Sequence, residues 1–339
     1  MKKIDYIGNY ASRGDINGQS IKTLAVENLM REIGLEVQRY DSSNRPFLSV
    51  IQSVINSRLK PHAISLGKKG LLVYLLTSTL TFNIKRERHF FIVGGWFLEY
   101  AKHPVIARLL RLFRANSAFY VESKKIAEAL NQAGFQTIVF PNFRENAQNL
   151  PQLPRKWQSG QPLHLMFLSR LIAEKGVFEC IELAKALEKE GMKVRLDIYG
   201  TGSTDTQDQV RHICAKEPNI DYKGKVAPEC VTDTMLDYNF LVLPSRYQGE
   251  CMPGVVVEAF SVGLPVITTD WRFLPEMVDH NINGGVFSGK NFAADAKDWI
   301  SGLTPDFFEQ LSLSAKEKFD TTYSLETAKT LIKKHMLKS

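Results

Sequence analysis

The chain has 339 residues, of which 44% are hydrophobic and 23% are charged. At about 100–200 residues per domain, this length predicts two domains with separate cores, and the composition excludes collagen-like, disulfide-framework and wholly disordered chains. The 43 Lys and Arg residues outnumber the 36 Asp and Glu residues, and residues 1–150 hold 21 of these cations against 11 acids. The excess positive charge of the first half forms either a solvated face or a surface for an anionic partner, such as a membrane, a phosphorylated acceptor or a nucleic acid.

Cysteine usage and hydropathy indicate the cellular compartment in which we expect the chain. The four cysteines lack the C-x-x-C spacing of a zinc site, and a reducing compartment is expected. The N-terminus runs into a strand pattern without the apolar core of a signal peptide. The most apolar stretch, residues 70–82, is about 13 residues long, whereas crossing a bilayer requires roughly 20. We therefore expect a cytoplasmic chain that rests on a membrane surface without crossing it.

Short apolar strands alternate with amphipathic helices along nearly the whole chain, which is typical of parallel, doubly wound sheets. In the first half we expect strands over 4–7, 35–39, 90–93, 118–121 and 137–140, and helices over 19–33, 99–113 and 124–133. Residues 141–162 are rich in Pro, Asn and Gln and predict a linker. In the second half we expect strands over 163–168, 194–199, 220–222, 240–243 and 266–268, and helices over 176–190, 255–262, 306–319 and 325–336.

Two doubly wound α/β domains that face each other across a cleft are the simplest architecture for this pattern. We predict an N-terminal domain over 1–150, a C-terminal domain over 151–321, and a last helix over about 322–339 that packs back on the first domain. Ligands bind such sheets at the carboxyl ends of the strands. A dinucleotide dehydrogenase is excluded because no G-x-G-x-x-G follows the first strand.

The loop after the strand over 240–243 combines features suited to a sugar nucleotide. A helix beginning near Pro253 presents free N–H groups and a partial positive charge, which favour phosphate. Glu250 and Glu258, with seven residues between them, frame this helix start and could accept hydrogen bonds from sugar and ribose hydroxyls. The alternative is a structural loop in which Glu250 caps the helix and Glu258 pairs with a surface cation.

A second candidate lies in the loop after the strand over 163–168. Arg170 and Lys175 precede a helix that starts near Gly176, and together they could neutralise a leaving diphosphate. Two surface cations at a helix entry are the alternative.

Together these motifs resemble glycosyltransferase family 4, the retaining sugar-nucleotide transferases of GT-B fold. The resemblance rests on Ser169-Arg170-Leu171 through Glu174-Lys175-Gly176, on the turn Gly200-Thr201-Gly202, and on Glu250 through Glu258. Tyr247-Gln248-Gly249-Glu250, Pro253-Gly254 and Thr269-Asp270-Trp271 resemble the branch that builds bacterial capsule, O-antigen and exopolysaccharide. In the first half, residues 17–23, 94–96 and 121–123 are similar to the same branch.

The resemblance implies roles for particular residues. Arg170 and Lys175 would hold the donor diphosphate and stabilise the leaving nucleotide, while Glu250 would contact the donor sugar. Glu258 would bind the ribose hydroxyls. Further donor contacts are implied at Met252, Pro253, Gly254 and Val255, at the turns of Gly200 and of Lys225 and Val226, and at Gly18. Cys251 stands where many members of the family carry glycine.

On the acceptor side, Gly95, His103 and Trp271 are candidates for the cleft, with Arg272 beside Trp271. His103 is the first-half histidine whose position suits a place near the reacting sugar carbon. A surface histidine of a helix and a tryptophan of the core or rim are the alternatives.

The implied activity is a metal-independent, retaining transfer of a hexose or N-acetylhexosamine from a nucleotide sugar, with UDP favoured, and no cofactor is expected. The acceptor would be a saccharide carried on polyprenyl diphosphate at the inner face of the plasma membrane. Basic stretches over 85–88 and 108–114 suit an anionic membrane surface, although a core-facing helix with a basic outer face fits the second stretch equally. A UDP-sugar epimerase of the same fold and a catalytically silent sugar-nucleotide-binding subunit are the alternatives, and no nucleic-acid-binding motif is present.

Overall fold

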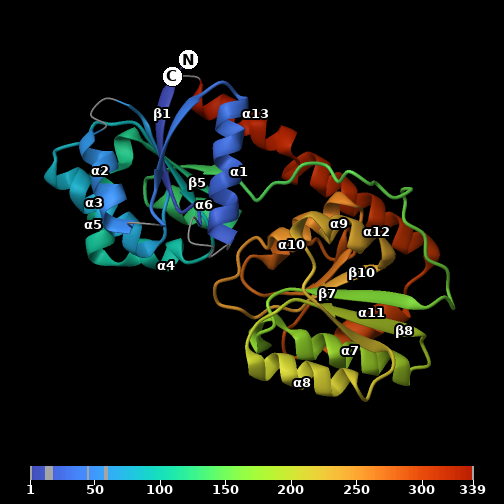
Figure 1. Ribbon diagram of the computed structural model, residues 1–339. Helices are drawn as coiled ribbons and strands as arrows, with labels where there is room; N and C mark the ends of the chain where they lie inside the picture. The colour runs from blue at the N-terminus through green and yellow to red at the C-terminus, as the bar shows by residue number, and fades with distance from the viewer. Residues whose placement is uncertain (1, 12–17, 44–45, 57–59, 338–339) are drawn as a thin grey trace. The chain divides into compact units, whose positions relative to one another are not determined.

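The computed structural model describes residues 2–11, 18–43, 46–56 and 60–337, and the chain divides into two compact units (Figure 1). Unit 1 comprises Met1–Asn142 with Ala328–Ser339, and unit 2 comprises Phe143–Thr327. Each unit is built on one six-stranded sheet whose strand pairs are parallel. The doubly wound α/β architecture predicted from the alternation of strands and helices is therefore confirmed within each unit.

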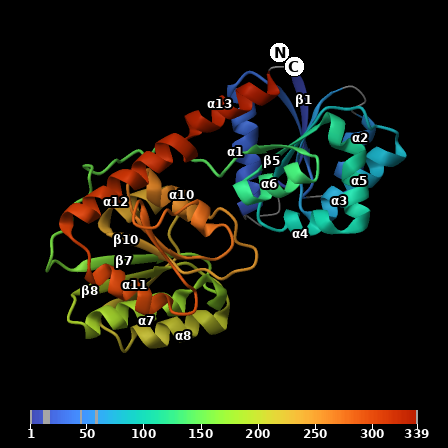
Figure 2. The same ribbon diagram turned by 180° about the vertical axis from the view of Figure 1, so that it is seen from behind.

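The sheet of unit 1 has the strand order β2-β1-β3-β4-β5-β6, so the chain reverses its direction of travel between β1 and β3. Its elements are β1 (Lys3–Gly8), α1 (Gly18–Glu32), β2 (Glu36–Asp41), α2 (Pro46–Asn56), β3 (His62–Ser65), α3 (Lys68–Leu80), β4 (Arg88–Ile92), α4 (Phe97–Lys102), α5 (Pro104–Phe113), β5 (Ser117–Val121), α6 (Lys124–Gln132) and β6 (Gln136–Val139). The last helix, α13 (Leu325–Met336), belongs to unit 1 from Ala328 onward. It lies beside α1, where Lys329 Nζ and Glu32 Oε2 are 2.9 Å apart (Figure 2).

Two predictions for unit 1 are wrong, each for an identifiable reason. The single helix expected over 99–113 is divided into α4 and α5, because Pro104 lacks an N–H and forces the preceding His103 into an extended conformation. The basic stretch over 85–88 is only partly at the surface, since Lys85 is exposed but Arg86 and Arg88 are 7% and 0% exposed. Arg88 donates hydrogen bonds to the carbonyls of Ile84 and Arg86, which satisfies its buried guanidinium.

The apolar stretch over 70–82 forms most of α3, which the periodicity did not reveal because its apolar residues surround the helix. Across the described residues, none of the helices has both the length and the hydrophobicity that crossing a membrane requires.

The sheet of unit 2 has the strand order β12-β11-β10-β7-β8-β9, and the strands predicted over 163–168, 194–199 and 240–243 are confirmed at both ends. All four residues of β10 are buried, as expected for a parallel strand covered on both faces. The elements are β7 (Leu163–Leu168), α7 (Val177–Lys189), β8 (Val194–Tyr199), α8 (Thr204–Cys214), β9 (Ile220–Gly224), α9 (Val231–Thr234), β10 (Phe240–Leu243), α10 (Gly254–Ser261), β11 (Val266–Thr269), β12 (Gly284–Phe287), α11 (Phe292–Ser301) and α12 (Pro305–Lys318).

The predicted linker over 141–162 is wrong in its extent, because the chain belongs to unit 2 from Phe143 onward. Arg155 anchors this segment: its guanidinium is buried and donates hydrogen bonds to the carbonyls of Met235 and Leu236, 3.1 and 2.8 Å away. Burial lowers the pKa of Arg155 to about 10, so desolvation opposes its charge. The carbonyl oxygens offset that cost and fix the segment to the body of unit 2.

We predict that Arg155→Met lowers the free energy of unfolding of unit 2 by about 3 kcal/mol, because several buried carbonyls lose their donor. Urea denaturation measures the change. The matched control is Lys156→Met, since Lys156 is the exposed neighbour of Arg155. Equal stability of the two variants would contradict an anchoring role.

Candidate functional site

The chain of unit 2 reverses its direction of travel across the sheet between β7 and β10, which lie side by side. Ligands of open α/β sheets bind at the carboxyl ends of the strands at such a reversal. The loops that follow β7 and β10 carry Arg170, Lys175 and Glu250. The loops also bond to each other, because Arg246 N donates to Glu174 O over 2.7 Å.

A buried ion pair joins these two loops. Lys175 Nζ lies 2.6 Å from Glu250 Oε2, and the two side chains are 9% and 7% exposed. Ser245 Oγ donates to the same carboxylate oxygen over 2.7 Å. Two of the sequence-predicted site residues are thus brought together as an ion pair that the sequence did not predict, and two donors orient the Glu250 carboxylate.

The ring of Tyr247 contacts both cations of the site. Arg170 Cζ and Lys175 Nζ lie 5.0 and 4.9 Å from the centroid of its ring, within the range of cation–π attraction. Trp271 Nε1 donates to Tyr247 O over 2.9 Å, so Trp271, which follows β11, holds the same loop. Arg170 is exposed, and its guanidinium is therefore accessible to an anion.

Two glycines allow the loops to approach this closely. Gly176 has φ of +86°, and a Cβ there would lie 2.3 Å from Pro244 O, in the loop after β10. Gly200, with φ of +129°, follows β8, and a Cβ there would lie 1.8 Å from Ser169 O. A side chain at either position would separate the loops, so both glycines are required by steric contact as well as by conformation.

The turn of Lys225 and Val226, which is predicted to contact the donor, lies next to Gly200. Gly200 N donates to Gly224 O over 2.8 Å, and Gly224 ends β9 directly before Lys225 and Val226. Lys225 is exposed and Val226 is half-buried. The structure therefore places these predicted donor contacts at the same carboxyl edge as Arg170.

Helix α10 begins at Gly254, and its first turn receives no side-chain cap. Met252 is buried, whereas Pro253 and Val255 are half-buried. Glu258, one turn into the helix, forms an ion pair with Arg144, whose Nε lies 2.8 Å from Glu258 Oε1. The predicted ribose ligand is thus already engaged by a cation that the motifs did not contain.

In unit 1, Gly18 is the exposed first residue of α1, while Asn17 of the predicted loop lies outside the described residues. Gly95 belongs to the loop after β4, where Gly94 N donates to Glu122 Oε2 over 2.9 Å. His103 is exposed at the junction of α4 and α5.

A buried ion pair that the motifs did not predict supports the Gly94 loop: Lys22 Nζ lies 3.9 Å from Glu122 Oε1 and donates to Pro141 O over 2.5 Å. Within the described stretches of the chain, no three His, Cys, Asp or Glu side chains gather as a metal site would require.

Sequence reasoning did not assign roles to Ser245, Tyr247 or Arg144. Ser245 and Tyr247 stand within the predicted loop after the strand over 240–243, and their polar and aromatic character was a usable signal. Arg144 gave none, because its partner Glu258 is 114 residues away along the chain.

Comparison with known proteins agrees with this placement. Residues 151–304, all within unit 2, match the family described as Glycosyl transferases group 1. The amylovoran biosynthesis glycosyltransferase AmsK of Erwinia amylovora is 28% identical over 131 residues, which are 37% of this chain and 32% of AmsK. The GDP-mannose-dependent alpha-(1-6)-phosphatidylinositol monomannoside mannosyltransferase of Mycobacterium tuberculosis is 26% identical over 155 residues, or 44% of this chain and 40% of that protein. The matches thus span well under half the length of these curated relatives.

The whole chain is similar in structure to Anabaena Alr3699/HepE, solved in complex with UDP and glucose, with a TM-score of 0.70, 15% identity and full coverage of both chains. This likeness and the two parallel sheets show that the chain has the two-domain α/β GT-B fold, which confirms the predicted fold class.

We predict that Lys175→Met lowers the free energy of unfolding by about 3 kcal/mol, because the Glu250 carboxylate is left buried without its cation. The double variant Lys175→Met/Glu250→Gln should lose less than the two single variants together, since neither charge remains. Urea denaturation of the three variants measures the coupling. Arg211→Met, which removes an exposed ion pair with Asp208, is the control and should change stability by less than about 1 kcal/mol. Additive losses would show that the pair is uncoupled.

Proposed function

We propose that the chain is a glycosyltransferase that moves a hexose or N-acetylhexosamine from a nucleotide sugar to a saccharide acceptor. The observation that carries this proposal is the convergence of Arg170, Lys175 and Glu250 at the strand-order reversal of unit 2. Cations at this edge suit a diphosphate leaving group, and the oriented carboxylate suits sugar hydroxyls. The match of residues 151–304 to group 1 glycosyl transferases supports the same activity.

In finer detail, we propose a family 4 enzyme that transfers with retention of anomeric configuration. Arg170 and Lys175 would stabilise the negative charge that develops on the departing diphosphate, assisted by the N–H groups at the start of α10. These groups would supply the positive charge that a divalent cation supplies in other transferases, so we propose that transfer needs no metal.

For the donor nucleotide we propose UDP. The similar Alr3699/HepE structure was solved with UDP and glucose, whereas the mycobacterial relative is named for GDP-mannose. The proposal therefore calls for a donor comparison that includes both nucleotides.

For the acceptor we propose a saccharide linked to polyprenyl diphosphate, used in bacterial surface polysaccharide synthesis. AmsK is named for amylovoran biosynthesis, and the mycobacterial relative is named for a phosphatidylinositol mannoside, which is a lipid. An acceptor of this kind would be met at the inner face of the plasma membrane.

One surface of unit 1 supports membrane docking. Helix α3 lies between α2 and α5, and the three helices expose large apolar side chains. Leu80 and Phe82, at the end of α3, are 78% and 89% exposed. The other exposed apolar side chains of this surface are Phe47, Leu48, Ile55, Leu76, Val105 and Leu112.

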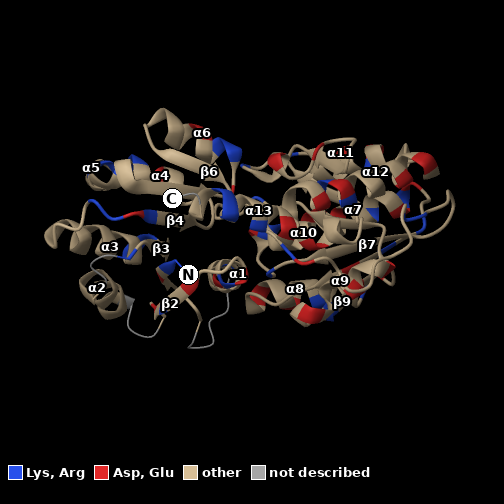
Figure 3. Ribbon diagram, turned by 90° about the horizontal axis from the view of Figure 1, so that it is seen from above, with Lys and Arg blue, Asp and Glu red and all other residues tan. Residues whose placement is uncertain are grey.

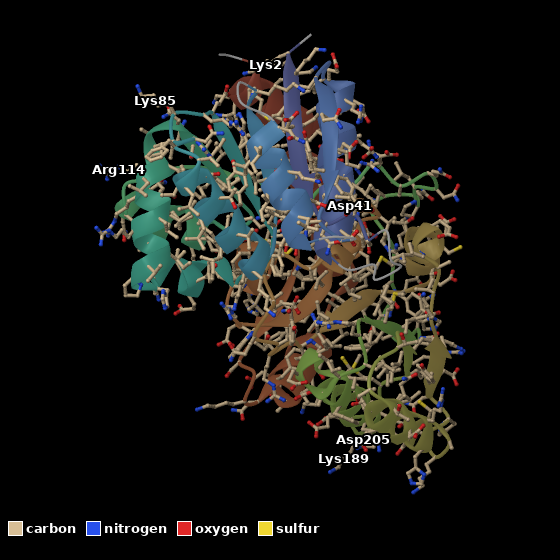
Figure 4. The ribbon with its side chains drawn as sticks, turned by 60° about the vertical axis from the view of Figure 1, so that its left-hand side comes forward. Lys2, Asp41, Lys85, Arg114, Lys189 and Asp205 are labelled. Carbon is tan, nitrogen blue, oxygen red and sulfur yellow. The ribbon has the colours of Figure 1, made fainter. Side chains whose placement is uncertain are left out.

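Cations accompany these apolar side chains. On α5, Ile106, Leu110 and Phe113 face the core, whereas Arg108 and Arg111 are exposed. Figure 3 marks the Lys and Arg positions of the helices in blue. Lys85 and Arg114 lie at the same edge of unit 1 (Figure 4). We propose that this basic and apolar surface docks on an anionic bilayer.

The donor proposal predicts that the purified protein, in EDTA, slowly releases nucleoside diphosphate from one sugar nucleotide. The screen compares UDP-glucose, UDP-galactose, both UDP-N-acetylhexosamines and GDP-mannose. Arg170→Ala should lower kcat/KM by at least about 100-fold, because a charge-stabilising donor is lost. The control is Arg195→Met, whose arginine pairs with Asp197 and Asp221.

Three other results of this screen would each contradict one part of the proposal. Activity that appears only when Mg²⁺ is supplied would contradict metal independence. Donor binding without release, even with a lipid-linked acceptor supplied, would indicate a silent subunit. No binding of any sugar nucleotide at millimolar concentration would contradict the donor site.

The docking proposal predicts that Leu80→Ser/Phe82→Ser weakens binding to vesicles containing anionic phosphatidylglycerol by about tenfold or more, because two apolar side chains no longer enter the bilayer. Vesicle co-sedimentation measures the binding. Leu313→Ser, at an exposed leucine of α12 in unit 2, should leave it unchanged. Equal binding by all three proteins would contradict docking through this surface.

A further inference from the structure

Arg144 lies where the two segments that connect the units run side by side within unit 2. Its N–H donates to Tyr323 O over 3.0 Å, and its carbonyl accepts from Leu325 N over 2.8 Å. These bonds form a parallel bridge between Arg144 and Ser324. The backbone of Arg144 is therefore fixed to the outgoing segment just after the chain enters unit 2.

The side chain of Arg144 extends from this point to α10. Its Nε lies 2.8 Å from Glu258 Oε1, and one terminal nitrogen, Nη1, donates to Phe143 O over 3.0 Å. The two side chains are 28% and 22% exposed, so the pair is partly shielded from water. In the part of the chain that the structure describes, the second oxygen of Glu258 has no hydrogen-bond partner.

Gly254 shows how closely the guanidinium approaches the start of α10. A Cβ at this position would lie 2.3 Å from Nη2 of Arg144 and 3.8 Å from Glu258 Oε1. No left-handed φ requires glycine at this position. A side chain at position 254 would therefore displace the guanidinium from the place that it occupies.

We propose that Arg144 is a positioning residue for the nucleotide end of the donor site. It engages one oxygen of Glu258 and thereby directs the other oxygen toward the ribose hydroxyls. It also adds a positive charge at the N-terminus of α10 and connects both features to the segments that join the two units. This inference rests on the proposed function, because it assigns Glu258 to a nucleotide.

The contact predicts a particular pattern among variants. Arg144→Met should raise the Kd for UDP and the KM for the donor roughly tenfold, with kcat within about threefold of wild type, because ground-state binding is lost. The Kd of Arg144→Lys for UDP should lie between those of wild type and Arg144→Met, since a lysine keeps the charge but lacks the planar guanidinium. Gly254→Ala should weaken UDP binding similarly by displacing the guanidinium. The double variant Arg144→Met/Gly254→Ala should be no worse than Arg144→Met alone.

Isothermal titration with UDP, steady-state kinetics and thermal melting are measured on the full chain. Arg195→Met is the control, because it removes an arginine from an ion pair elsewhere in unit 2. The positioning role is overturned if Arg144→Met binds UDP within twofold of wild type while Glu258→Gln does not. If Arg144→Met fails to fold, the same criterion applies to Arg144→Lys. Additive effects in the double variant would overturn the steric link to Gly254. Wild-type protein that binds no nucleotide at millimolar concentration would overturn the proposed function and this inference with it.

Discussion

The buried ion pair between Lys175 and Glu250 is the interaction on which the site of unit 2 depends. Its two partners come from loops that are neighbours only because the strand order reverses between β7 and β10. Burying either charge alone would be costly, so the pair constrains both loops to one geometry. The carboxylate also accepts from Ser245, and the ammonium lies over the ring of Tyr247. Arg170 joins the same ring from the exposed side, which leaves its charge accessible.

Close packing of backbone makes that convergence possible. Gly176 and Gly200 bring three loops together at the carboxyl edge, where a Cβ would collide with a carbonyl oxygen. Gly254 serves a different purpose, since it makes room for the Arg144 side chain at the start of α10. The helix start, the cations and the two carboxylates therefore lie on one edge of the sheet.

Unit 1 has a buried ion pair at the carboxyl edge of its sheet and exposed apolar side chains on its helices. The Lys22–Glu122 pair holds the loop of Gly94 at the carboxyl edge of the sheet. Its helix α5 exposes Arg108 and Arg111 together with Val105 and Leu112, and α2 exposes Phe47 and Leu48. The charge excess of the first half is thus divided between exposed cations and two buried arginines, Arg86 and Arg88, of which Arg88 donates to backbone carbonyls.

The sequence by itself determined the doubly wound class, most strands of both units and the membership of the candidate site in unit 2. These features depend on local periodicity and on short motifs that follow strands, which a single chain displays without its fold. Tertiary structure decided the rest. It divided the helix at Pro104, buried Arg86 and Arg88, and bound Arg155 to carbonyls of unit 2. It also paired Arg144 with Glu258, because hydrogen bonds and ion pairs between residues more than 100 positions apart are set by packing and leave no periodic trace in the sequence.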